Sequence, residues 1–249
     1  MIARYAGGER GARDAARSGS AVVVVDAFRA SVTIAVLVSK GARVVPVASI
    51  EEARAYREAD LRAGERDGAK VAGFDFGNSP TEILESEVPP GSTVAFSTTN
   101  GTRVVEAARG APAVFVGAFV NATALANALA SGDYGSLMVV GCGWKGRRAS
   151  EDEAAAGAIL HRLGERGVEL DARARRVVEA YRGRSLERLR DNRAARRLER
   201  LGYERDLNLC LAEDTVPVVP RLVEGVFVRE TTGARNLRPG AGTESQNSS

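Results

Sequence analysis

The segment AVVVVDAFRASVTIAVLVSKGARVVPVAS, residues 21–49, indicates the fold of the chain. It opens with a β-branched apolar run at 21–28, continues through a helical stretch at 31–41 and closes with a second apolar run at 42–49. Strands that are apolar at every residue are typical of parallel sheets with helices on both faces. The segment therefore predicts a βαβ unit within a sheet of that kind.

The same alternation continues along the chain. Further apolar runs, separated by helical stretches, lie at 93–99, 111–119 and 136–143. The order of strand, polar loop, helix and glycine that ends at Gly41 recurs and ends at Gly110. We therefore predict an α/β fold: a three-layer α/β/α sandwich with a largely parallel sheet and two weakly repeated βαβ halves.

The chain length suits a single domain. Its 249 residues, 44% of them hydrophobic, are enough for one large core or two small ones. The first residues are rich in Gly, Arg and Ser, and the last are polar and lack periodicity. We expect one α/β domain at 21–230 between poorly ordered ends at 1–20 and 231–249.

Composition excludes several classes of protein. No apolar run reaches about 18 residues and the N-terminus lacks a signal-peptide core, so we expect a cytoplasmic protein without membrane contact. The two cysteines fit a reducing compartment. The single histidine, His161, excludes paired-histidine phosphatases and histidine-clamped dinuclear metal sites. A homodimer is also expected, although the sequence of one chain does not decide the oligomeric state.

A basic segment at 172–205 carries twelve arginines interleaved with glutamates. A solvated helix face with ion pairs is the preferred interpretation. Aromatic side chains for base stacking are nearly absent here, so we expect no nucleic-acid partner.

The first chemically informative loop is DAFRAS, residues 26–31. An unpaired carboxylate in a core loses its hydration, so Asp26 is expected at the end of the preceding strand, where it can hold a hard cation. Ligands bind at this end of parallel sheets. The alternative is that Asp26 caps the following helix and pairs with Arg29.

The second loop, GFDFGNSP at 73–80, has the Gly, Asn and Pro of an ordinary turn. Asp75, however, lies between two phenylalanines, and its charge requires a partner. A metal ion shared with Asp26 would supply that partner.

The third loop is STTNGTR, residues 97–103. Main-chain amides at a helix N-terminus bind anions, and Gly101 permits close approach. The hydroxyl groups and Arg103 add further donors. Helix capping by Thr98 or Thr99 explains only one or two of these residues.

The fourth loop is GCGWKGRRASEDE, residues 141–153. Its glycines satisfy G-x-G-x-x-G, a weak dinucleotide-binding signal when it stands alone. The helix is expected later, at the capping box of Ser150 and Glu153. A cationic loop for an anionic ligand, formed by Lys145, Arg147 and Arg148, is therefore preferred to a dehydrogenase.

Together, DAFRAS, GFDFGNSP, STTNGTR and the SED that precedes AAGAIL resemble, in order and spacing, the 2-phosphosulfolactate phosphatase family. The likeness runs from about Val22 to Pro220. It implies a magnesium-dependent phosphomonoesterase that acts on a small 2-phosphorylated acid. Three departures are Ala194-Ala195 in place of a His-Gly pair, alanine for a common cysteine after EDE, and a bulkier Gly-Trp-Lys loop; they put the identity of the substrate in doubt.

Our hypothesis is hydrolysis of a small anionic phosphorylated substrate such as 2-phosphosulfolactate, which releases phosphate and the 2-hydroxy acid. Alternatives are another phosphorylated substrate or a non-catalytic anion-binding protein. The expected Mg²⁺ ligands are Asp26, Asp75, Glu151 and Asp152. The expected catalytic residues are Asp26, Arg29, Asp75 and Asn100. The expected substrate-binding residues are Ser31, Asn78, Thr98, Thr99, Gly101, Thr102, Arg103, Lys145 and Arg147.

Overall fold

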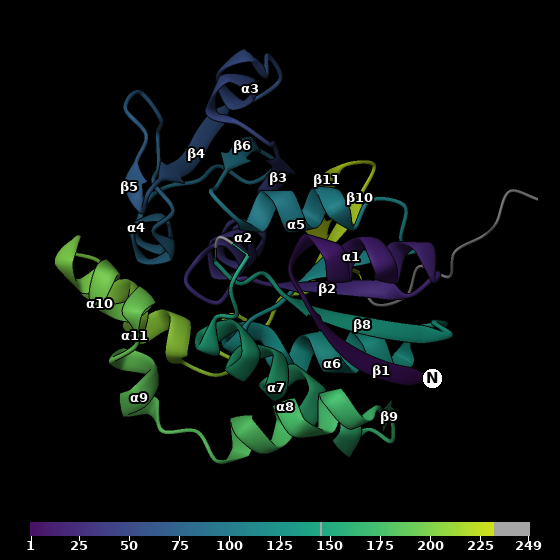
Figure 1. Ribbon diagram of the computed structural model, residues 1–249. Coiled ribbons are helices and arrows are strands. Elements are labelled where there is room, and N and C mark those ends of the chain that lie inside the picture. The colour runs from purple at the N-terminus through teal and green to yellow at the C-terminus, as the bar shows by residue number, and fades with distance from the viewer. Residues whose placement is uncertain (145, 232–249) are drawn as a thin grey trace, which may run out of the picture.

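The computed structural model describes residues 1–144 and 146–231. These residues form an 11-stranded sheet in the order β5-β4-β6-β3-β11-β10-β7-β2-β8-β1-β9 (Figure 1). The strands are β1 (Ile2–Gly7), β2 (Ala21–Val25), β3 (Arg43–Pro46), β4 (Leu61–Arg66), β5 (Ala69–Lys70), β6 (Thr93–Ser97), β7 (Val114–Val116), β8 (Ser136–Gly141), β9 (Glu169–Leu170), β10 (Pro220–Val223) and β11 (Val226–Arg229).

Helices cover both faces of this sheet. They are α1 (Gly8–Arg17), α2 (Ala30–Ser39), α3 (Ile50–Ala55), α4 (Pro80–Glu85), α5 (Gly101–Ala107), α6 (Ala122–Ser131), α7 (Ser150–Glu165), α8 (Ala172–Arg182), α9 (Leu186–Arg190), α10 (Arg193–Arg200) and α11 (Glu204–Leu211), with a 3₁₀ turn η1 (Phe119–Asn121) before α6. Among the described residues, no helix is both long and apolar enough to cross a bilayer.

The valines of β2 explain the three layers. Val22 and Val24 pack in one core cluster with α1, α2 and α5, whereas Val23 and Val25 pack in another with α6, α7 and α8. Figure 1 shows α1 and α5 on one side of β2 and β8, and α6 to α8 on the other. A strand buried on both faces must be apolar at every position. The predicted α/β/α sandwich is therefore confirmed.

The sheet consists of two parallel groups joined by an antiparallel hairpin. One group contains β4, β6 and β3, and the other contains β7, β2, β8, β1 and β9. The hairpin of β10 and β11 lies between them, antiparallel to β7 and β3. Each repeated βαβ unit spans both groups, because β2 pairs with β7 and β3 pairs with β6. The repeat thus describes the order of the chain, not two separate halves of the sheet.

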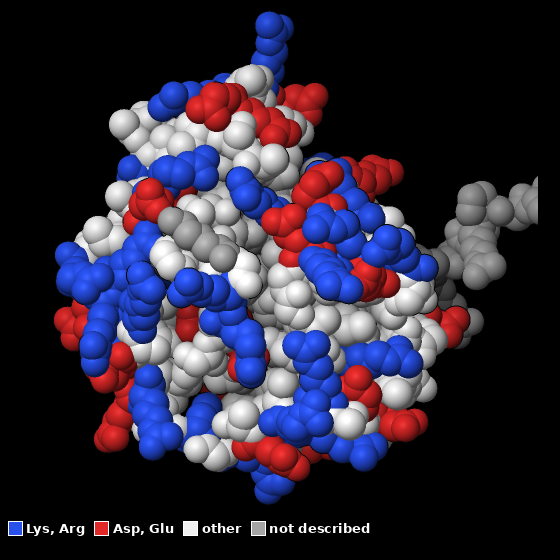
Figure 2. All heavy atoms as spheres, viewed as in Figure 1, with Lys and Arg blue, Asp and Glu red and all other residues white. Residues whose placement is uncertain are grey.

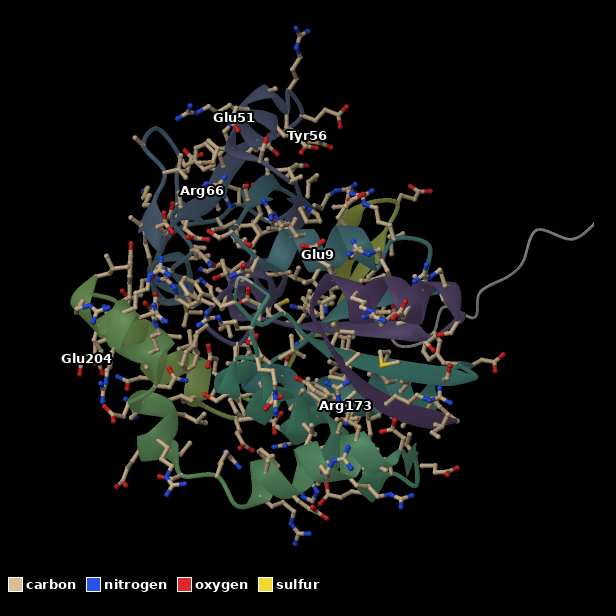
Figure 3. All side chains as sticks on the ribbon, viewed as in Figure 1. Glu9, Glu51, Tyr56, Arg66, Arg173 and Glu204 are labelled. Carbon is tan, nitrogen blue, oxygen red and sulfur yellow. The ribbon has the colours of Figure 1, made fainter. Side chains whose placement is uncertain are left out.

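The N-terminal residues differ from expectation. Residues 1–20 contain β1, which pairs with β8 and β9, and α1. Tyr5 is buried in β1, and the Cζ of Arg173 of α8, which is labelled in Figure 3, lies 5.3 Å from the Tyr5 ring centroid. This order depends on long-range strand pairing, which a Gly- and Arg-rich local sequence does not reveal. The tail expected at 231–249 lies, apart from Thr231, outside the described residues.

Candidate active site

A cavity of about 250 Å³ lies where β2, β4, β6 and β8 reach their carboxyl ends. Strand-end loops converge there, as ligand sites do in parallel sheets. The expected site residues that line the cavity are Asp26, Arg29, Asn78, Thr98, Thr99, Asn100, Arg147, Glu151 and Asp152.

Asp26 follows β2 directly, and the start of α2 fixes its position. Its main-chain N–H donates to Ser31 Oγ at 2.9 Å, and its Oδ1 accepts from the Ala30 N–H at 3.3 Å. Burial raises the pKa of Asp26 to about 7; Glu65 and Glu151 add to this, while the Ala30 N–H opposes it. The carboxyl group therefore changes charge near neutral pH in the metal-free protein.

Asp152, in the first turn of α7, joins two of the loops. Its Oδ1 accepts from the Ala27 N–H and its Oδ2 from the Gly143 N–H, both at 2.8 Å. Burial raises the pKa of Asp152 well above its usual range, and the charges of Asp26 and Glu151 add to the effect. The neighbouring carboxylate of Glu151 accepts from Asn192 Nδ2 at 2.8 Å. Its pKa is also raised by burial.

Glu65 is a site residue that the sequence analysis missed. It lies in β4, is only 6% exposed and lines the cavity. Its Oε1 accepts from the Thr99 N–H at 2.7 Å, and its Oε2 accepts from the Gly68 N–H at 2.6 Å. The signal that could have found it is the one used for Asp26, a carboxylate at the end of a strand.

Asp75 is not brought to this group. Its side chain is exposed, does not line the cavity, and accepts from the Arg62 N–H at 2.7 Å through Oδ2. The partner that its charge required is thus a main-chain amide.

The STTNGTR loop supplies neutral donors to the cavity. Gly101 packs so closely that a Cβ there would lie 3.1 Å from Asp26 Oδ2 and 3.4 Å from Thr98 Oγ1. Within the described residues, the buried hydroxyls of Thr98 and Thr99 have no hydrogen-bond partner. Buried hydroxyls are normally paired, so these two, on residues that line the cavity, are candidates to bond the oxygens of a ligand.

Several expected binding residues serve the scaffold instead of lining the cavity. The Ser31 hydroxyl donates to the Val24 carbonyl at 3.2 Å, and the Thr102 hydroxyl donates to the Thr98 carbonyl at 3.1 Å. Gly101 lies behind the lining, and Arg103 is exposed outside it. Lys145 is outside the described residues.

Arg29 lines the cavity, but its guanidinium is held by other groups. Nη1 lies 2.5 Å from Asp206 Oδ2, and Nη2 donates to the Gly68 carbonyl at 3.0 Å. Its Cζ lies 4.0 Å from the Tyr203 ring centroid. Arg29 therefore pairs with Asp206. The alternative interpretation of the sequence had paired Arg29 with Asp26 instead.

The carboxylates and hydroxyls of the cavity can be compared with the ligands that a Mg²⁺ site requires. Among the described residues, no group of three or more His, Cys, Asp or Glu side chains is placed to hold a metal ion. Mg²⁺ usually takes one or two carboxylates and completes its shell with water and phosphate oxygens. Asp26, with a neighbouring carboxylate and two unpaired hydroxyls, fits a hard cation that binds together with a phosphate, not a cage made wholly of protein ligands.

Known proteins resemble this chain over most of its length. A family model for 2-phosphosulpholactate phosphatase matches residues 9–225. A protein of Gloeobacter violaceus is 40% identical over 214 residues, which cover 83% of this chain and 90% of that protein. A protein of Thermotoga petrophila is 38% identical over 209 residues, with the same shares. Both are named probable 2-phosphosulfolactate phosphatase.

Proposed function

Because this chain belongs to the 2-phosphosulfolactate phosphatase family and is a phosphoric monoester hydrolase, we propose that its cavity hydrolyses a small 2-phosphorylated acid with the help of Mg²⁺. The names of its relatives make 2-phosphosulfolactate the first substrate to test. The observation that carries the proposal is the meeting of buried carboxylates with unpaired threonine hydroxyls in one cavity. In the reaction a water oxygen bonds to phosphorus, the ester P–O bond breaks, and the leaving oxygen takes a proton.

The residues divide into two sets. Asp26, with Glu151 or Asp152, would hold the cation, which would supply positive charge to polarise the phosphoryl oxygens and to lower the pKa of the attacking water. Thr98, Thr99 and Asn100 would donate to the phosphoryl oxygens as negative charge develops on them.

Arg29 acts mainly on position, and Asp152 also has a positioning role, whether or not it holds the cation. Arg29 keeps the DAFRAS loop against the β4–β5 turn through its bond to the Gly68 carbonyl. Asp152 holds the ends of the first and fourth loops together through its two main-chain bonds. Asp75 has no part in this proposal, because it lies outside the cavity.

Phosphate release from 2-phosphosulfolactate, with and without chelator and with added Mg²⁺, tests the proposal. We expect chelation to abolish turnover and Mg²⁺ to restore it. Asp26→Asn should lower kcat/KM by on the order of 10³-fold, because it removes a cation ligand. Asp75→Asn is the matched control and should retain activity. Turnover that ignores the chelator, or an active Asp26→Asn protein, would contradict the mechanism.

A further inference from the structure

The cavity is lined by groups of both charges. Its carboxylates, Asp26, Glu65, Glu151 and Asp152, come from strand ends of the sheet and from α7, and its arginines other than Arg29 come from the fourth loop and from α10. The α10 contribution, Arg193 and Arg197, comes from the segment that the sequence suggested was a solvated helix face. Figure 2 shows Lys and Arg side chains gathered over α10, at the left of the view.

Arg197 is held in place with little neutralisation of its charge. Its Cζ lies 5.8 Å from the Trp144 ring centroid, and a Cβ at Gly68 would lie 3.4 Å from its Nη2. The side chain is 29% exposed, and its ion-pair partner among the described residues is Asp67 at 3.8 Å, itself 75% exposed. A long pair with so exposed a carboxylate is worth little, so the guanidinium keeps its capacity for a ligand.

Arg193 lies one helical turn before Arg197, on the same face of α10. Its Cζ is 5.3 Å from the Trp144 ring centroid. Two guanidinium groups therefore lie near the same indole in the lining of the cavity. Guanidinium groups bind carboxylate and sulfonate oxygens through two parallel hydrogen bonds. A phosphoryl group bound at Thr98 and Thr99 would leave the donors of these two guanidinium groups unused.

We propose that Arg197 and Arg193 form a subsite for a second acidic group of the substrate, a sulfonate or carboxylate. The inference rests on the proposed function, because it assigns the phosphoryl group to the Asp26 and Thr98 end. The subsite makes α10 the element that selects phosphorylated acids over neutral phosphate esters. Arg200, on the same helix but exposed and outside the cavity, provides a matched control.

Kinetics with three substrates test the subsite: 2-phosphosulfolactate, 2-phospholactate and isopropyl phosphate, which has no second acidic group. Arg197→Ala should lower kcat/KM for the two acids by roughly 10- to 100-fold, mainly through KM, as expected for a lost charged hydrogen bond. Isopropyl phosphate should change by less than about twofold. Arg197→Lys should restore part of the loss, and Arg200→Ala should change nothing. Equal losses on all three substrates, or no loss on the acids, would overturn the proposal.

Calorimetric binding of 3-sulfolactate and of inorganic phosphate separates this inference from the proposed function. Arg197→Ala should weaken the binding of 3-sulfolactate and leave the binding of phosphate unchanged. If the wild-type protein hydrolyses none of the phosphates but Arg197→Ala shows this selective loss of binding, the subsite stands and the proposed function fails. If it hydrolyses them and Arg197→Ala has no selective effect on kinetics or binding, the subsite fails.

Discussion

At the scale of single residues, the sequence was most informative where a polar residue ends an apolar strand. Asp26 and Thr98 both reach the cavity, because parallel strands bring their carboxyl ends to one edge. Glu65 escaped notice because LRAGER does not read as an apolar strand. Asp75 misled because its phenylalanine neighbours suggested a buried charge, yet the side chain is exposed and bonded to a main-chain amide.

The raised pKa of Asp26 predicts how pH affects stability in metal-free protein. Its pKa is about 7 in the folded protein, against about 4 for an ordinary aspartate. The folded state therefore favours the protonated form, and stability is lost as the pH rises through 7. Asp26→Asn should raise the free energy of unfolding at pH 8 by on the order of 2 kcal/mol, and this gain should shrink as the pH falls toward 4.

Urea denaturation in the presence of chelator at pH 5 and pH 8 measures this effect. Asp75→Asn serves as the control, because that carboxylate is exposed. If Asp26→Asn raises the free energy of unfolding equally at both pH values, ionisation of the Asp26 carboxyl group does not lower the stability of the folded protein.

At the scale of elements, the basic segment at 172–205 shows that the position of a helix in the fold could not be predicted from the local sequence pattern. Within this segment Leu189 and Leu198 are buried, whereas Leu186 is 49% exposed. Arginine periodicity gave no sign that α10 lines the cavity, because that depends on how α10 packs with α11 and with Phe28 of the first loop. Long-range packing of this kind is invisible in a window of one helix.

We predict that the buried carboxylate of Asp206 fixes α11 to the site. Its carboxylate is fully buried and accepts from the Ser79 hydroxyl at 2.8 Å, from the Thr81 N–H at 3.1 Å and from the Thr81 hydroxyl, besides pairing with Arg29. Asp206→Ala leaves the buried guanidinium without its counter-ion, which costs about 3–5 kcal/mol.

Chemical denaturation should show that loss for Asp206→Ala. Arg205→Ala, on the same helix as Asp206, breaks only an exposed pair with Glu85 of α4 and should leave stability unchanged. Similar midpoints for the two variants would mean that the buried pair does not anchor α11.

At the scale of the whole molecule, the sheet order was the least accessible to sequence reasoning. The three layers followed from the valines of β2, which must be covered on both faces. The position of the β10–β11 hairpin did not, because its antiparallel pairing with β7 and β3 joins residues more than 100 positions apart. The two parallel groups of the sheet are thus connected through the last strands of the described chain.

This connection predicts that the molecule unfolds as one cooperative unit. Phe227 in β11 is fully buried and packs in the core cluster that contains residues of both parallel groups, including Val24 and Phe96. Phe227→Ala should therefore cost about 3–5 kcal/mol and lower a single transition, followed by far-ultraviolet circular dichroism and by the fluorescence of Trp144, the one tryptophan. Val223→Ala, at a 43% exposed position in the same hairpin, should have little effect. Separate transitions for the two probes in the wild-type protein would show instead that the parallel groups unfold independently, because a hairpin that couples them forces both signals to change together.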